Sequence, residues 1–156
     1  MICVKGDVLK APFQIIAHQV NCKGVMGAGL AKQIKQKYPM VYERYENHCQ
    51  RGAYLGDCVG CDTPDHHYIM NIFAQDGYGR DKVYTDYDAM YQSFRRGISE
   101  FRENACEGRY VAQLTIAIPY MIGCGLAGGD WDEVQKILLA VEKDCNVAFV
   151  AYDICS

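Results

Sequence analysis

The sequence predicts an α/β fold in which helices cover a mixed, largely parallel sheet. Short β-rich runs alternate along the chain with longer amphipathic runs, an order typical of layered α/β domains. The 156 residues are enough for one hydrophobic core, and 50% of them are apolar. No repeat, low-complexity segment or linker divides the chain. We therefore expect a single domain spanning residues 1–156.

Strands are expected where β-branched and other apolar residues cluster, and the last is apolar enough to be buried on both faces. The predicted strands are Ile2–Lys5, Ile15–Val20, Asp57–Cys61, Tyr68–Ile72, Thr115–Ile118 and Ala148–Ile154. Helices are expected where apolar residues are spaced three and four apart. The predicted helices are Gly29–Lys37, Val41–Arg51, Tyr87–Asn104 and Trp131–Asp144. Pro39 separates the first two helices, because the residue before a proline resists helical geometry.

Charge and hydropathy exclude several classes of protein. The formal net charge of -3 argues against nonspecific nucleic-acid binding, which depends on clustered lysine and arginine. No apolar run approaches the ~18 residues needed to cross a membrane. The N-terminus also lacks a signal-peptide pattern. We expect a cytoplasmic protein without a membrane partner.

The nine cysteines are expected to be structural rather than paired or metal-binding. Cys58 and Cys61 form a C-x-x-C motif, but no second C-x-x-C or H-x₃-H pair completes a zinc site. We therefore expect no metal and no cofactor. The cysteines predicted to be small buried hydrophobes are Cys3, Cys22, Cys124 and Cys155.

A glycine-rich segment, Asn21–Gly29, joins the second predicted strand to the first predicted helix. It holds three glycines within six residues, with small or apolar residues between them. Such a loop directs free backbone N–H groups and a helix N-terminus toward one point, which favours a phosphate. The spacing matches neither the nucleotide-triphosphatase loop nor Gly-x-Gly-x-x-Gly.

Two further loops follow strands at the same expected edge of the sheet, at residues 74–81 and 122–130. Ligands of open α/β sheets bind beyond the carboxyl ends of the strands. The two glycine-rich loops, Asn21–Gly29 and 122–130, together predict a ligand with a pyrophosphate; the alternative is two tight turns that hold no ligand. Asp7, after the first strand, is suited to accept a hydrogen bond from an exocyclic amine such as that of adenine.

Taken together, these segments resemble the macrodomain family over essentially the whole chain. The resemblance implies a three-layer α/β/α fold and ADP-ribose or a derivative as the ligand. Two branches are most similar: the yeast-type ADP-ribose-1″-phosphate phosphatases and the terminal ADP-ribose protein glycohydrolases, including those that act on DNA bases. The segments that carry the resemblance are Gly6-Asp7-Val8, His18–Cys22, Met26–Ala31 and Ile122–Leu126.

The resemblance also implies ligand-binding roles. Asp7 and the Val8 amide would bind adenine, and Asn21 would hold the distal ribose. Tyr152 is either an adenine-side neighbour or a buried tyrosine. The residues expected around the ribose and the diphosphate are Gly27, Ala28, Gly29, Leu30, Gly123, Cys124, Gly125, Leu126 and Ala127.

The implied activity is hydrolysis of ADP-ribose derivatives. ADP-ribose-1″-phosphate is the first candidate substrate, followed by ADP-ribose on a protein or nucleic-acid acceptor. His18 matches the phosphatase histidine, although a strand histidine with satisfied nitrogens is the alternative. The candidate catalytic residues are His18, Asn21 and Asp130, with Asp76 as another possible base.

The glycohydrolase branch carries a lysine and an aspartate where this chain has Gln75 and Ala127. A covalent lysine mechanism is therefore not expected. This departure keeps open a different class of function, a module that binds ADP-ribose without catalysis.

Overall fold

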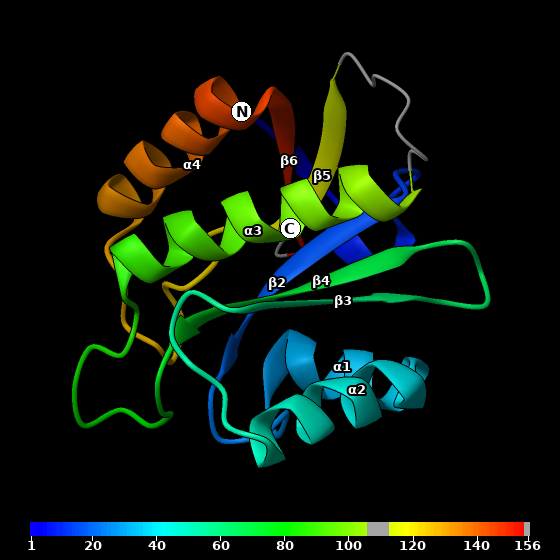
Figure 1. The fold of residues 1–156 in the computed structure, drawn as a ribbon. Helices are drawn as coiled ribbons and strands as arrows, with labels where there is room; N and C mark the ends of the chain where they lie inside the picture. Colours follow the sequence, from blue (N-terminus) through cyan, green and yellow to red (C-terminus); the bar gives the residue numbers. More distant parts are fainter. Residues whose placement is uncertain (106–112, 155–156) are drawn as a thin grey trace.

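The computed structural model describes residues 1–105 and 113–154 and contains one mixed sheet (Figure 1). Its strand order is β1-β6-β5-β2-β4-β3, with β3 antiparallel to β4 and the other pairs parallel. This confirms the prediction of a mixed, largely parallel sheet. The strands are β1 (Ile2–Lys5), β2 (Ile15–Asn21), β3 (Cys58–Asp62), β4 (Tyr68–Gln75), β5 (Leu114–Pro119) and β6 (Val147–Asp153).

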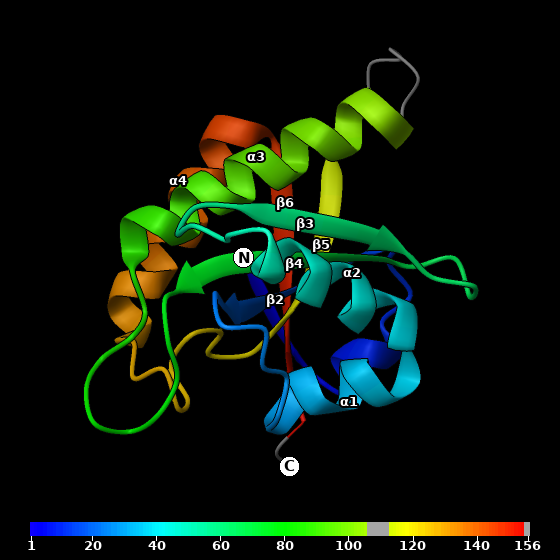
Figure 2. The ribbon, with the colours of Figure 1, turned by 60° about the horizontal axis from the view of Figure 1, so that its bottom comes forward.

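Helices cover both faces of the sheet and give the three α/β/α layers that were predicted. Two helices and a short 3₁₀ helix lie on one face, and two longer helices lie on the other (Figures 1 and 2). On the first face are η1 (Val8–Lys10), α1 (Gly29–Lys37) and α2 (Pro39–Gln50). On the second are α3 (Tyr87–Ala105) and α4 (Trp131–Cys145).

Strand β2 is buried on both faces, and the alternation of its side chains determines toward which helical layer His18 and Gln19 point. Ile15 and Ala17 pack into the core beneath α3 and α4, while Ile16 packs toward α1 and α2. Because successive strand residues point to opposite faces, His18 lies on the α1 face and Gln19 on the α3 face. Two polar side chains thus reach the end of one strand from opposite layers.

The predicted strands and helices are confirmed, with ends that move by at most a few residues. Helix α1 has the predicted bounds, whereas β4 runs on to Gln75 instead of ending at Ile72. The η1 helix was not predicted; it begins after Asp7, whose carboxylate accepts a hydrogen bond from Leu9 N at 2.9 Å. The longer β4 matters because it carries Gln75 to the edge where the loops meet.

Two connections far apart in the sequence lie side by side at this edge. The segment between β4 and α3 contacts the segment between β5 and α4 (Figure 1). Both Tyr84 N and Thr85 N donate to Ala127 O, at 2.8 and 3.2 Å. The two loops therefore form a joined wall beyond the carboxyl ends of β2, β4 and β5.

Candidate functional site

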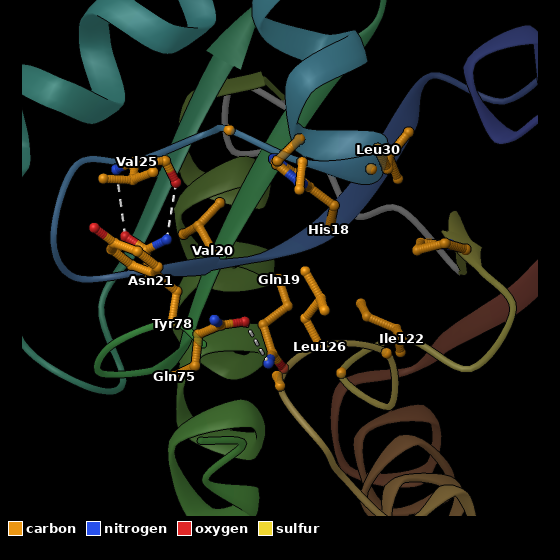
Figure 3. Close-up of a pocket in the computed structure, with 18 of the residues that line it drawn as sticks. His18, Gln19, Val20, Asn21, Val25, Leu30, Gln75, Tyr78, Ile122 and Leu126 are labelled. Carbon is orange, nitrogen blue, oxygen red and sulfur yellow. Dashed lines mark hydrogen bonds between the residues drawn. The ribbon is translucent and has the colours of Figure 1, made fainter. Parts of the chain in front are cut away.

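A pocket opens beyond the carboxyl ends of β2, β4 and β5, with a cavity volume of about 660 Å³ (Figure 3). Loop residues line it on three sides: the segment before α1, the connection after β4 and the connection after β5. Its position agrees with the rule that open α/β sheets bind ligands past the carboxyl ends of their strands.

The Asn21–Gly29 loop is held in shape by the side chain of Asn21. Its Nδ2 donates to Val25 O at 2.8 Å, and its Oδ1 accepts from Val25 N at 3.3 Å (Figure 3). The same Oδ1 accepts from Lys23 N at 3.0 Å. The hydroxyl of Tyr45 lies 2.8 Å from the same Oδ1. Asn21 lines the pocket, but most of its hydrogen-bonding capacity braces the loop.

Helix α1 begins at the pocket with unsatisfied amides. Its N-cap residue is Ala28, and no side chain caps the first turn. The first N–H groups of a helix have no partner within the helix, and together with the helix dipole they favour an anion. Four predicted ligand residues line the pocket here: Gly27, Ala28, Gly29 and Leu30.

The loop after β5 forms the opposite wall. Gly123 has a φ of +77°, and its carbonyl accepts hydrogen bonds from Gly129 N at 2.9 Å and Thr85 Oγ1 at 2.6 Å. The bond from Thr85 ties the loop to the segment before α3, and the bond from Gly129 closes the loop on itself. Of the five ligand residues predicted here, Gly123, Gly125, Leu126 and Ala127 line the pocket, whereas Cys124 is not among the lining residues.

His18 lines the pocket but is almost fully buried. Its Nε2 lies 2.6 Å from Oδ1 of Asn71, whose Nδ2 donates to Val59 O at 2.8 Å. That second bond fixes the Asn71 amide, so His18 must donate from Nε2 and keep Nδ1 as its acceptor. Burial lowers the pKa of His18 to about 4, although the hydrogen bond with Asn71 raises it. The ring is neutral at physiological pH.

A second polar network lies on the other face of β2. Gln19 Nε2 donates to Gln75 Oε1 at 2.9 Å (Figure 3). It also donates to Thr85 Oγ1 at 2.9 Å, and Gln75 Nε2 donates to Gly77 O at 2.9 Å. The side-chain amide of Gln75 connects β2 with the loop that follows β4. Gln19, Gln75 and Asn71 were not predicted as site residues, because their role depends on pairing between strands.

Comparison with known protein families agrees with the geometry of this site. The family described as Macro domain matches residues 17–138. The chain belongs to the macrodomain family.

Relatives of this macrodomain include enzymes of two kinds. A DNA ADP-ribosyl glycohydrolase of Mycobacterium tuberculosis is 30% identical, over 94% of this chain and 40% of that protein. The macrodomain therefore spans well under half of that relative's length. An ADP-ribose 1″-phosphate phosphatase of Scheffersomyces stipitis is 24% identical, over 92% of this chain and 96% of that protein. Among solved structures, the macrodomain of M. tuberculosis DarG has a TM-score of 0.76 and 30% identity, over 97% of this chain and 95% of that one.

Four predicted site residues of this macrodomain lie outside the pocket lining: Asp7, Val8, Cys124 and Asp130. Asp7 caps η1, and Val8 is buried in the core on the α1 face. Asp130 caps α4, where its Oδ1 accepts from Asp132 N at 2.9 Å. Tyr152 is partly buried against the same core as Val8. Their predicted roles toward a ligand remain predictions.

The structure adds pocket residues that sequence reasoning missed. Tyr78 and Arg80 enter from the connection after β4, and Tyr120 and Met121 from the end of β5. The only signal in the sequence was that a glycine-containing loop follows β4 at the same edge of the sheet as the loops after β2 and β5. Composition alone did not show which of its side chains turn inward.

The burial of the cysteine side chains differs in part from the prediction. Cys58 and Cys61 are buried, as expected of structural cysteines, but Cys3 is exposed, so the prediction of burial is wrong there. It sits on β1, an edge strand with one neighbour, which leaves its side chain in solvent. Cys22 and Cys124 are half-buried, and Cys155 lies outside the described residues. Within residues 1–105 and 113–154, no group of His, Cys, Asp and Glu side chains is placed to hold a metal.

None of the helices in the described part of the chain combines the length and the apolar character that crossing a membrane demands.

Proposed function

We propose that this macrodomain binds ADP-ribose in the pocket and hydrolyses ADP-ribose derivatives, with ADP-ribose-1″-phosphate as its first substrate. The observation that carries the proposal is that two glycine-rich loops face each other across one cavity. The uncapped start of α1 faces the pocket on one side, and the Gly123–Ala127 loop faces it on the other. A diphosphate between them would be bound by backbone amides.

The proposed orientation follows the strand order. Asp7 follows β1 and Tyr152 belongs to β6, at one side of β5, whereas Asn21 and Gln75 end β2 and β4 at its other side. Adenine would lie toward β6 and the distal ribose toward β2, consistent with the roles predicted for Asp7 and Asn21. The C1″ atom would then lie near the end of β4.

In the proposed reaction, water attacks the phosphorus of the C1″-phosphate. The P–O bond to C1″ breaks, its electron pair stays on the C1″ oxygen, and a proton from the water completes the ribose hydroxyl. The products are ADP-ribose and inorganic phosphate. Backbone amides and a positioned water would supply the catalysis. A neutral His18, with Nδ1 as acceptor, is suited to orient a hydroxyl or water rather than to donate a proton.

Release of ADP-ribose from an acceptor is the second enzymatic candidate, favoured by the 30% identity to a DNA ADP-ribosyl glycohydrolase. Its partner would be an ADP-ribosylated nucleic acid or protein. A different class of function, a non-catalytic ADP-ribose reader, is favoured by one observation. None of the described residues lining the pocket carries a carboxylate that could serve as a general base.

Calorimetry tests the binding of ADP-ribose, which both the enzyme and the reader require. The expected result is saturable binding at micromolar concentrations. Absence of binding contradicts both the enzyme and the reader. Phosphate release from ADP-ribose-1″-phosphate then separates the two. We expect turnover by the parent and a lower rate for His18→Ala and Asn21→Ala, with Asn47→Ala, exposed on α2, as the matched control. Binding without turnover by the parent would support the reader, and ADP-ribosylated DNA in the same assay tests the acceptor alternative.

A further inference from the structure

Arg80 is the one charged residue among the described residues that line the pocket. Its side chain is exposed, and the acids of its own loop are engaged elsewhere. Asp76 Oδ1 lies 3.9 Å from Lys23 Nζ, and Asp81 Oδ1 accepts from the hydroxyl of Tyr84 at 2.7 Å. No carboxylate in the described part of the chain pairs with the Arg80 guanidinium. It is therefore available to an anion in the pocket.

The loop that carries Arg80 is shaped to present it. Gly79 has a φ of +135°, and a Cβ there would lie 2.9 Å from Asp81 Oδ1. Residues Tyr78 and Arg80, on either side of Gly79, both line the pocket. The base of the loop is anchored by the bond from Gln75 Nε2 to Gly77 O. An anchored loop with a glycine between two inward residues gives Arg80 a defined place at the rim.

Arg80 belongs to the connection after β4, whose later residues Tyr84 and Thr85 donate hydrogen bonds to Ala127 O in the loop after β5. The α1 loop follows β2 and the Gly123–Ala127 loop follows β5, whereas Arg80 follows β4, on the far side of β2 from β5. Neighbouring strands are ~4.8 Å apart. In the proposed orientation C1″ lies near the end of β4, so the connection that carries Arg80 borders the C1″ side of the pocket.

We propose that Arg80 binds an anionic group carried on C1″ of the distal ribose, in the first instance a phosphate, and sets the preference of the pocket for that ligand. This inference rests on the proposed function and names the residue that distinguishes ADP-ribose-1″-phosphate from ADP-ribose. A planar guanidinium forms paired hydrogen bonds with a phosphate, which a lysine ammonium cannot reproduce.

The test compares the affinities of ADP-ribose and ADP-ribose-1″-phosphate for the parent, Arg80→Ala, Arg80→Lys and Lys82→Ala. The ligand titrations are carried out at low temperature, and chromatography afterwards checks that the phosphate ester is intact. Lys82 is the matched control, since it is exposed on the same loop, lies over the Tyr84 ring at 4.9 Å and does not line the pocket. We expect the parent to bind the phosphorylated ligand about tenfold more tightly, because hydrogen bonds between charged groups contribute roughly one decade of affinity.

Arg80→Ala should abolish that preference while leaving the affinity for ADP-ribose nearly unchanged. Arg80→Lys should keep part of the preference, and Lys82→Ala should keep all of it. An equal loss of affinity for both ligands in Arg80→Ala would place the arginine on the diphosphate and overturn the inference, as would an equal effect of Lys82→Ala. Failure of the parent to bind ADP-ribose is a different outcome, because it overturns the proposed function itself.

Discussion

His18 Nε2 lies 2.6 Å from Asn71 Oδ1, across the register pair that joins β2 to β4. The Asn71 amide cannot turn over, because its Nδ2 donates to Val59 O on β3. Three neighbouring strands therefore determine which nitrogen of the histidine carries the proton. The pairing also explains how a polar side chain is accommodated at a buried position beside the pocket.

The burial of His18 predicts a loss of stability in acid. The pKa of His18 is about 4 in the folded protein, against 6.5 ordinarily, so the unfolded chain binds this proton first as the pH falls. The stability is intact above pH 6.5 and is lost between 6.5 and about 4. Between pH 7.5 and 4.5 the parent should lose about 2–3 kcal/mol more than His18→Gln, which keeps an N–H donor but does not titrate. Urea unfolding at both pH values measures it; equal acid sensitivity of the two proteins contradicts the assignment.

Gly123 should not tolerate a side chain. A Cβ there would lie 2.8 Å from Gln19 Oε1 and 3.1 Å from Met90 Cε, at a φ of +77°. Gln19 cannot easily move away, because its Nε2 is held by Gln75 and Thr85. We expect Gly123→Ala to lower the free energy of unfolding by about 2–3 kcal/mol, from strain and lost hydrogen bonds.

Gly125→Ala is the matched control for Gly123, since a Cβ at Gly125 meets no atom within 4 Å. Its free energy of unfolding should stay within about 0.5 kcal/mol of the parent. Urea denaturation of both variants is the measurement. Equal stability of the two variants would show that the loop after β5 adapts freely, contrary to the hydrogen bonds at Gly123.

The two glycine loops were predictable because their signals are local. An apolar strand followed by closely spaced glycines and then a helical pattern places the Asn21–Gly29 loop at a sheet edge without any knowledge of pairing. The same holds for the loop after β5, and both line the pocket. Local signals sufficed for most of the fold for the same reason, since the helices carry apolar residues three and four apart and the inner strands are runs of apolar residues.

The remaining features of the site depend on contacts between distant segments. Arg80 was not predicted, because its inward course depends on the φ of Gly79 and on the anchor that Gln75 provides. Asp130, in contrast, was predicted as a catalytic base. An aspartate just before a helix can equally act as the N-cap of that helix, and the structure places Asp130 at the N-terminus of α4. The sequence does not distinguish these two roles.

Gly97 lies on the face of α3 that packs against β3 and β4, and it should resist replacement by alanine. A Cβ there would lie 2.5 Å from Cys58 Sγ and 2.9 Å from Met70 Sδ. In an open helix this change would stabilise by roughly 1 kcal/mol. Here we expect a loss of about 1–3 kcal/mol, because the added methyl overfills the core.

Ser99→Ala, at an exposed position of the same helix, provides the comparison for Gly97→Ala. Thermal or urea unfolding of both variants measures the effect. If Gly97→Ala were as stable as Ser99→Ala or more so, the close packing of α3 on β3 and β4 would be contradicted.

Trp131 should report ligand binding by its fluorescence. It is the single tryptophan of the chain, and its ring meets that of Tyr120 edge-on with 5.2 Å between centroids. Tyr120 lines the pocket, so a ligand that contacts it changes the surroundings of the indole. We expect ADP-ribose to change the Trp131 emission of the parent and of Tyr54→Leu, whose replaced ring is exposed away from the pocket lining. In Tyr120→Leu the change should shrink although calorimetry still detects binding; an undiminished signal there would mean that the ligand reaches Trp131 by another route.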